Sequence, residues 1–488
     1  MQRNFQSLAC LGVVALLASG AAAQEKDPRV NPPILPIGVE SSSKAPGEAG
    51  GPPAPAKPEV TPDQEPLSSG NWLGLGFWDG GRSYLVGGFS LNSGFDTNSQ
   101  NTANGGWQSR SSFNARVGMQ RVWSRSQFNM NYTIGGQLYN SRQSAAQRNG
   151  ALVQSLALSH SLAWRRWSLS LSESFSYLPE SSFGGGAGAG SGFGNGGFGG
   201  LGGFGIPGLN IPGTPNPFVT PGQTILTTRG ARIGNSIGGQ VGYSLSPRAQ
   251  ITANAAFSMQ RFLEGSFIET NATVFSAGYN YVLNSKDTIA TRYVGQQMSF
   301  LGASGGVNAH NIHLSYARRV TGRMSLQVSG GPAFNEMRSP LGTTTRRQSW
   351  SAMTGWQYAW PNLNVGASYS RSITDGSGVL SGANTHAVSF NVGRRLSRMW
   401  SGGASIRYAH NSSLSGLNGG TPASFDSWNL GVRLSRPLGR SMSLNTGYNM
   451  QHQSRSVCAL AGSGCFPTSL RHVFSIGFSW QMQPIDLE

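Results

Sequence analysis

Apolar and polar residues alternate along most of this 488-residue chain, from residue 72 to residue 482. Phe113 and Val117 share one parity of a typical stretch, whereas Asn114 and Arg116 share the other. Successive side chains of a β-strand point to opposite faces, so a period of two predicts strands with one apolar and one polar face. The pattern recurs about eighteen times with no helical period between, so the chain is predicted to be all-β.

The links between these stretches also alternate, between short and long. Eight short and nine long links join eighteen strands, with both ends of the strand array on the short-link side. The short links lie near residues 124–125, 165–166, 246–248, 284–286, 321–322, 361–362, 396–397 and 437–439, and the long links near 97–106, 140–150, 178–229, 262–270, 301–306, 335–347, 372–384, 411–424 and 454–468.

Composition and aromatic placement indicate an apolar surrounding for these strands. Only 11% of the residues are charged, against about 25% in soluble domains. After residue 23 the chain has no apolar run of the ~18 residues that a spanning helix needs. Tryptophans stand beside the short links, at Trp123, Trp164, Trp360 and Trp400. An amphipathic ring suits a boundary between lipid and water, whereas a soluble β-sandwich has no reason to gather indoles there.

Alternation, unequal links and an aromatic rim together resemble the outer-membrane β-barrel superclass, with porin-like size, over nearly all of residues 72–482. No motif of a particular family is present in the sequence. The resemblance implies one transmembrane antiparallel barrel of about 18 strands in the bacterial cell outer membrane, surrounded by its lipids. The final stretch, residues 469–482, is similar to the terminal strand that such barrels present to the outer-membrane assembly machinery, although it lacks a terminal aromatic residue.

Three segments are predicted along the chain. Residues 1–23 read as a signal peptide, with an apolar stretch at residues 8–17 and small residues at 21–23. Residues 24–70 hold eleven prolines, so they are expected to form a disordered Pro-rich periplasmic tail. Residues 71–488 form the predicted barrel.

The sequence predicts neither an enzyme nor a cofactor or metal site. The Gly-rich link 178–229 contains a G-x-G-x-x-G pattern at residues 192–197, but no helix follows to complete a nucleotide site. The seven histidines are scattered, and no nucleophile elbow or paired-acid motif is present. Export argues against nucleic acid as a partner. The link 178–229 is too long for a turn, and it is expected to constrict the lumen, to cover the mouth or to be a disordered surface loop.

Arginine carries most of the formal net charge of +17. Arginines beside the short links suit contact with lipid phosphates. A second group falls on the polar parity within strands, with no acid evident on that parity, and is predicted to line the pore. Glu173 instead falls on the apolar parity of its strand, which alternation alone does not explain. The predicted pore-lining residues are Arg110, Arg116, Arg232, Arg292, Arg407, Arg433 and Arg471.

These features predict an outer-membrane pore for polar solutes with a preference for anions. Barrels of 16–18 strands leave an aqueous channel, and basic lumen walls attract anionic solutes. Two alternatives stay open: a channel exporting an acidic exopolysaccharide, and a non-conducting surface adhesin or structural barrel. The sequence alone predicts no oligomeric state.

A disulfide between Cys458 and Cys465 is the first testable prediction. They are the cysteines that remain once the signal peptide with Cys10 is removed. Such pairs form disulfides in the oxidising compartments that exported proteins enter. Closing a ring of this size contributes on the order of 2–3 kcal/mol of local order in the loop-entropy description. Alkylation of the unreduced protein should label neither thiol, and alkylation after reduction should label both. Full labelling before reduction would contradict the pairing.

Overall fold

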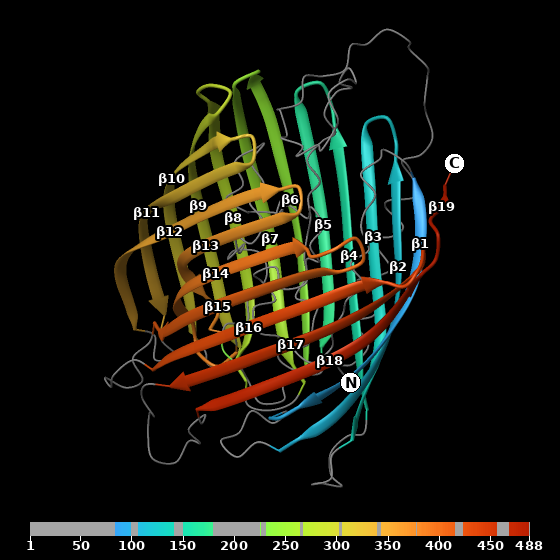
Figure 1. The fold of residues 1–488 in the computed structure, drawn as a ribbon. Helices are drawn as coiled ribbons and strands as arrows, with labels where there is room; N and C mark the ends of the chain where they lie inside the picture. Colours follow the sequence, from blue (N-terminus) through green and yellow to red (C-terminus); the bar gives the residue numbers. More distant parts are fainter. Residues whose placement is uncertain are drawn as a thin grey trace, which may run out of the picture. The chain divides into compact units, whose positions relative to one another are not determined.

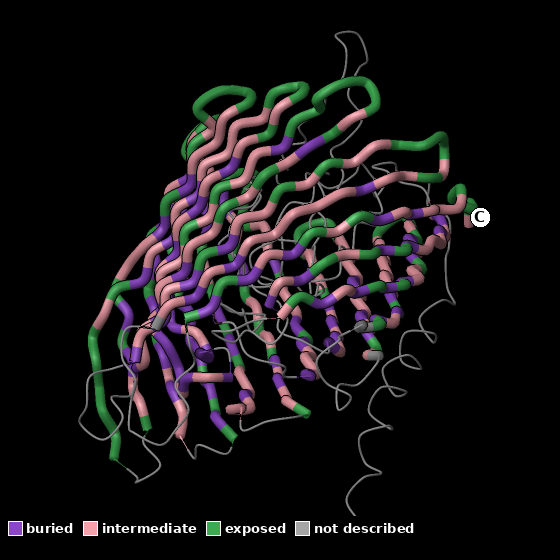
Figure 2. The backbone as a smooth tube through the Cα atoms, turned by 60° about the horizontal axis from the view of Figure 1, so that its bottom comes forward, coloured by how far each residue is buried: buried purple, intermediate pink, exposed green. Residues whose placement is uncertain are grey.

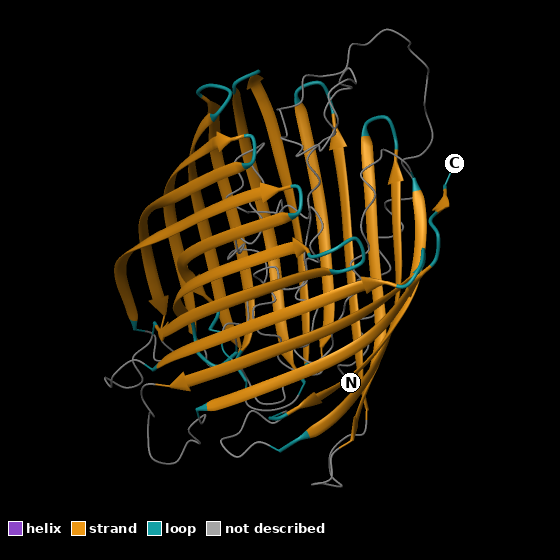
Figure 3. Cartoon of the chain, in the orientation of Figure 1, coloured by secondary structure: helices purple, strands orange, loops and turns teal. Residues whose placement is uncertain are grey.

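The computed structural model describes residues 83–98, 106–140, 150–178, 225, 231–263, 267–301, 305–338, 343–376, 378–414, 423–455 and 468–487. The predicted signal peptide, the Pro-rich tail and both cysteines of the predicted disulfide lie outside these residues. The described part consists of strands and the links between them (Figure 3). Among these residues no helix is long and apolar enough to cross a membrane.

Eighteen antiparallel strands form one closed barrel (Figure 1), as the alternation predicted. Each strand pairs with its neighbours in the chain, and β18 pairs with β1 to close the sheet. The strands are β1 (Tyr84–Asp96), β2 (Gln108–Val122), β3 (Ser126–Asn140), β4 (Gly150–Ala163), β5 (Trp167–Leu178), β6 (Arg232–Ser246), β7 (Ala249–Phe262), β8 (Glu269–Val282), β9 (Asp287–Leu301), β10 (Gly305–Thr321), β11 (Met324–Arg338), β12 (Thr344–Trp360), β13 (Leu363–Thr374), β14 (Ala383–Arg395), β15 (Ser401–Ser413), β16 (Ser424–Pro437), β17 (Met442–Arg455) and β18 (Ser469–Gln481), followed by the short β19 (Ile485–Asp486).

The links lie where the sequence predicts them around the barrel, but several of the long links are shorter than predicted. The link expected at 335–347 spans only residues 339–343, between the ends of β11 and β12. The link expected at 301–306 spans only residues 302–304, because β9 and β10 keep pairing up to Phe300 and Gly305. Strand lengths run from 12 residues in β5 to 17 residues in β12. About 9–11 residues suffice to cross the hydrocarbon core, so the strand ends extend beyond it at both rims.

The seam between β1 and β18 continues past the end of β18. β18 pairs with β1 from Gly88 to Asp96. Below Gly88, β19 pairs with Tyr84 and Leu85, and the Leu487 amide donates to the Ser83 carbonyl over 2.9 Å. The residues after β18 therefore cover the remaining edge of β1.

The ladder between β12 and β13 is incomplete at the long-link end. It runs from Trp360–Leu363 to Ala352–Arg371, while β12 itself continues to Thr344. At the long-link end, residues 344–351 of β12 stay paired with β11. Beyond Arg371, β13 stays paired with β14 up to Thr374. The wall therefore forks on the long-link side of the Ala352–Arg371 pair, and we call this point the fork.

Deletion of residues 483–488 should weaken the barrel at its seam. The deletion exposes the edge of β1 near Tyr84 and Leu85, and each lost backbone hydrogen bond removes about 0.5–1.5 kcal/mol of net stability. On a gel, the temperature at which the fast band of the folded, unheated barrel converts to the slow band of the unfolded chain should fall. Replacing the same residues with a Gly-Ser stretch of equal length separates loss of the pairing from loss of length. An unchanged conversion temperature in the deletion would contradict a role for this segment in the seam.

Candidate functional site

The two faces of the wall differ in chemistry, as the alternating burial along the strands shows (Figure 2). On β2, Arg110, Ser112 and Asn114 are buried, whereas Phe113 is 49% exposed and Val117 is also exposed. The same alternation of covered polar and uncovered apolar side chains recurs on the other strands. A soluble protein covers its large apolar side chains, so the outward apolar face requires an apolar surrounding.

Aromatic side chains border this outward face at both ends. Trp123, Trp164 and Trp360 are exposed beside the short links, and Trp350 and Trp428 are exposed near the long links. Aromatic girdles mark the two headgroup boundaries of a barrel in a bilayer. The protein is an outer-membrane β-barrel. Its outward face is called the lipid face below, and the opposite face is called the lumen face.

All seven arginines predicted as pore-lining have the parity of the lumen face. Arg232 is 2% exposed, and Arg110 and Arg471 are also buried, while the other four are partly covered. They occupy different heights along the wall. Arg232 stands at the long-link end of β6, Arg407 in the middle of β15, and Arg433 in the short-link half of β16.

One acid shares the lumen face with them, contrary to the reading that no acid has this parity. Asp96, the last residue of β1, accepts hydrogen bonds from Arg471 Nε at 3.0 and 3.1 Å, and both side chains are buried. The sequence reading missed Asp96 because the residue stands where the alternation passes into a link. Leu91 and Phe95 are exposed and lie on the opposite parity of β1. The alternation of this strand therefore places Asp96 on the lumen face.

The other acids of strands β1–β18 lie on the lipid face. Glu173 is among them: its ladders with Leu158 and Ile237 run without a register shift, so no bulge turns it inward. It makes no hydrogen bond or ion pair with another described residue. The remaining four stand near strand ends and contact neighbouring polar side chains: Glu269, Asp287, Glu336 and Asp426.

Uncharged polar groups fill the lumen face between the arginines. Serine hydroxyls bond across neighbouring strands, at 2.6 Å between Ser174 and Ser236 and 2.8 Å between Ser315 and Ser329. His313 is buried on the same face with Nε2 3.2 Å from the Ser351 hydroxyl. No three His, Cys, Asp or Glu side chains of the described residues form a group that could hold a metal ion.

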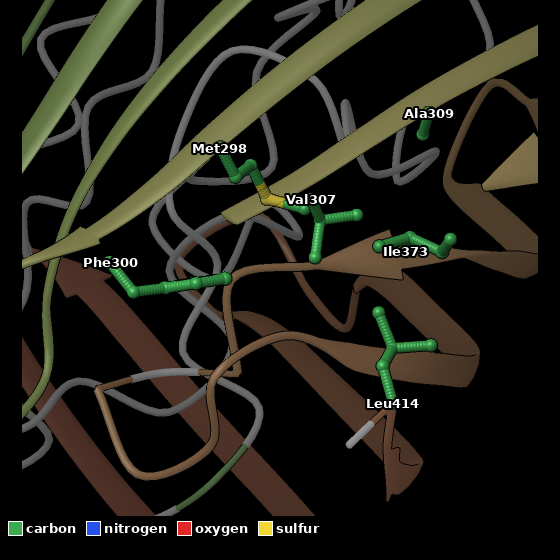
Figure 4. Packing of buried hydrophobic residues seen from close by; sticks show 6 residues of the cluster. All are labelled: Met298, Phe300, Val307, Ala309, Ile373 and Leu414. Atoms are coloured by element: carbon green, nitrogen blue, oxygen red, sulfur yellow. The ribbon is translucent and has the colours of Figure 1, made fainter. Parts of the chain in front are cut away.

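The end of β13 packs inside the wall rather than continuing its cylinder. Ile373 and Leu414 share a buried apolar cluster with Phe300 and Val307 of β9 and β10 (Figure 4). Strands β11 and β12 lie between these two parts of the sheet, so the contact crosses the inside of the mouth. We call residues 373–382, which lead from β13 into β14, the tucked segment.

Glycine permits the tight path of the tucked segment. Gly376 and Gly382 have φ angles of 75° and 84°, which residues with a Cβ rarely adopt. The Gly378 carbonyl accepts a hydrogen bond from the Ile268 amide at 2.8 Å. The segment is therefore joined to the β7–β8 side of the barrel as well as to β9 and β10.

One described residue of the long link 178–229 also lies against the lumen face. Ile225 is buried in a second apolar cluster with Leu380, Ala423 and Phe425. Phe425 has the parity of the lumen face of β16, because it is buried while Trp428 is exposed. Ile225 thus packs inside the wall beside the tucked segment, at the long-link end.

Comparison with known proteins finds similar folds but no sequence relatives. No protein-family model and no curated protein matches the chain. Among solved structures, outer membrane protein OpdK from Pseudomonas aeruginosa is 11% identical with a TM-score of 0.41, covering 82% of this chain and 99% of that one. OccAB4 from Acinetobacter baumannii is 10% identical with a TM-score of 0.42, covering 82% and 99%. OpdQ from Pseudomonas aeruginosa is 8% identical with a TM-score of 0.42, covering 84% and 100%.

Releasing the contact between Ile225 and Leu380 should widen the mouth. Removing a packed Leu or Ile side chain costs about 2–5 kcal/mol, so the double substitution Ile225→Ser with Leu380→Ser should detach both segments while the wall stays closed. Single-channel conductance of the variant should exceed that of the unaltered protein. Leu380→Met keeps volume and apolarity and serves as the control with unchanged conductance. Equal conductance in all three proteins would show that this cluster does not limit the aperture.

Proposed function

We propose that this protein is a passive outer-membrane pore for polar solutes that favours anions over cations. The observation that carries the proposal is the separation of charge across the wall. The lumen face of strands β1–β18 holds the seven predicted arginines and one carboxylate, Asp96, while the five other acids of these strands face outward. A second inner carboxylate, Asp375, is buried in the tucked segment.

Guanidinium groups inside a low-dielectric wall favour anions. Arginine keeps its proton at any pH near neutrality, and apolar walls focus the field of such charges along the channel. The partly covered arginines stand at different heights, for example Arg407 in the middle of β15 and Arg433 in the short-link half of β16. An anion leaving one guanidinium therefore meets another before it reaches the opposite rim.

The uncharged part of the lumen suits small polar solutes. Serine, asparagine and glutamine side chains cover the lumen face between the arginines, and they offer hydrogen bonds of either sense. The tucked segment narrows the mouth with apolar side chains on one side. A polar wall with a partly apolar constriction favours solutes of limited size that carry an anionic group.

The alternatives differ from this proposal in what they conduct. Export of an acidic exopolysaccharide needs the same basic lumen but an aperture that passes a sugar chain. A surface adhesin or structural barrel needs no conduction at all. Discrete conductance steps from purified protein in a planar bilayer would favour a pore, and their absence would favour the adhesin or structural barrel.

Changing lumen arginines to glutamine should reduce anion selectivity. The triple variant Arg116→Gln, Arg407→Gln and Arg433→Gln removes three positive charges from the channel, so the reversal potential under a salt gradient should move toward that of an unselective pore. The preference of the unaltered protein should also weaken with salt, because the Debye length falls from ~10 Å at 0.1 M to ~3 Å at 1 M.

Three outward arginines provide the matched control. Arg318, Arg346 and Arg394 lie on the outer parity of their strands, and the first two contact Asp287 and Glu336. Their change to glutamine removes the same formal charge outside the channel. A cation-selective pore, or equal effects of the two triple variants, would overturn the proposed role of the lumen arginines.

A further inference from the structure

A cationic pair stands on the lipid face at the fork. Arg371 of β13 and His386 of β14 are direct partners across their ladder. Both have the parity of the lipid face, since Val388 and Phe390 on the same side of β14 are exposed. Partners across an antiparallel ladder have Cβ atoms about 4.5–5.5 Å apart, so the two side chains can contact one ligand.

Arg371 has no carboxylate partner among the described residues. Its guanidinium carbon lies 4.1 Å above the Trp350 ring, and its Nε–H is buried without a hydrogen-bond partner. Each lipid-face acid near this rim has another partner: Glu336 lies 3.3 Å from Arg346, and Glu269 lies 3.4 Å from Arg261. Asp426 contacts Tyr408 and His410. The positive charge of Arg371 is therefore held in place by an indole, and no acid of the described strands neutralises it.

His386 adds a hydrogen-bond donor beside this charge. The Tyr369 hydroxyl lies 3.2 Å from His386 Nδ1. When that hydroxyl donates to Nδ1, the neutral ring carries its proton on Nε2 as a free donor. His410, the next residue along the row, has Nδ1 2.8 Å from Asp426, so its carboxylate neighbour confines an anion to the Arg371 side.

The pair stands just beyond an aromatic belt. Tyr369, Tyr408 and Trp428 occupy neighbouring positions of the lipid face one step deeper. Arg371 is the fourth residue from the long-link end of β13, and His386 is the fourth residue of β14. This height, between an aromatic belt and the long links, is where the headgroups of the outer leaflet lie.

We propose that Arg371 and His386 bind a phosphate group of an anionic lipid in the outer leaflet. Guanidinium matches phosphate oxygens with parallel N–H donors, and the Nη groups of Arg371 supply such donors. Trp350 holds the guanidinium in place, and the fork leaves the space above it free of a β12–β13 ladder. The site is independent of conduction through the lumen.

Native mass spectrometry of the detergent-solubilised mature protein tests the site with lipid A as the probe. The unaltered protein should retain bisphosphorylated lipid A more tightly than lipid A from which both phosphates have been removed. The double variant Arg371→Gln with His386→Gln should bind the phosphorylated form at least about tenfold more weakly, because it loses charge-assisted hydrogen bonds to the phosphate. Conductance and the unheated gel mobility of the variant should not change.

Arg121→Gln is the matched control, because Arg121 stacks on Trp123 at the opposite rim, with 5.2 Å from the guanidinium carbon to the ring centroid. This variant should bind lipid A as the unaltered protein does. Equal binding by the double variant, or equal binding of dephosphorylated lipid A, would overturn the proposal. Displacement of the lipid by millimolar inorganic phosphate would overturn it as well, since it would assign the site to a free anion rather than to a lipid.

Discussion

A strand in a lipid bilayer cannot leave its backbone N–H and C=O groups without hydrogen-bond partners, and this constraint governs the whole molecule. In hydrocarbon each unpaired group costs several kcal/mol, so a sheet must close on itself. Closure occurs where β1 meets β18, and residues 482–487 complete the pairing along the lower part of β1. Asp96 and Arg471 join the same two strands from the inside.

Closure also fixes the faces of every strand, and so it separates the charges. Once one register is set, each residue belongs either to lipid or to lumen, because a slip of one residue would exchange the two. The seven predicted arginines lie on the lumen face, further arginines lie on the lipid face, and five of the six acids of strands β1–β18 lie on the lipid face. The proposed anion preference and the proposed lipid-phosphate site follow from arginines on opposite faces of one wall.

Local pattern predicted the strands, the strand number and the parity of the seven arginines and of Glu173, since alternation is a property of neighbouring residues. It did not predict contacts between distant parts of the chain. The pairing of Asp96 with Arg471 joins residues at opposite ends of the barrel sequence, so the pattern of neighbouring residues does not predict it. The packing of Ile373 against Phe300 and Val307 likewise depends on how the wall folds inward. Glu173 shows the converse, because its parity was read correctly although its presence on the lipid face has no explanation in the described contacts.

The incomplete ladder between β12 and β13 makes the barrel mechanically uneven. Elsewhere along the described wall, two neighbouring strands can separate only by breaking ladder hydrogen bonds. Beyond the Ala352–Arg371 pair, toward the long links, β12 and β13 are not paired with each other. The tucked segment is retained by apolar packing of Ile373 and Leu380 and by the hydrogen bond from the Ile268 amide to the Gly378 carbonyl. Outward displacement of that segment requires the loss of apolar packing, on the order of a few kcal/mol, and no rupture of the β12–β13 ladder. The mouth can therefore dilate along this line while the rest of the cylinder keeps its circumference.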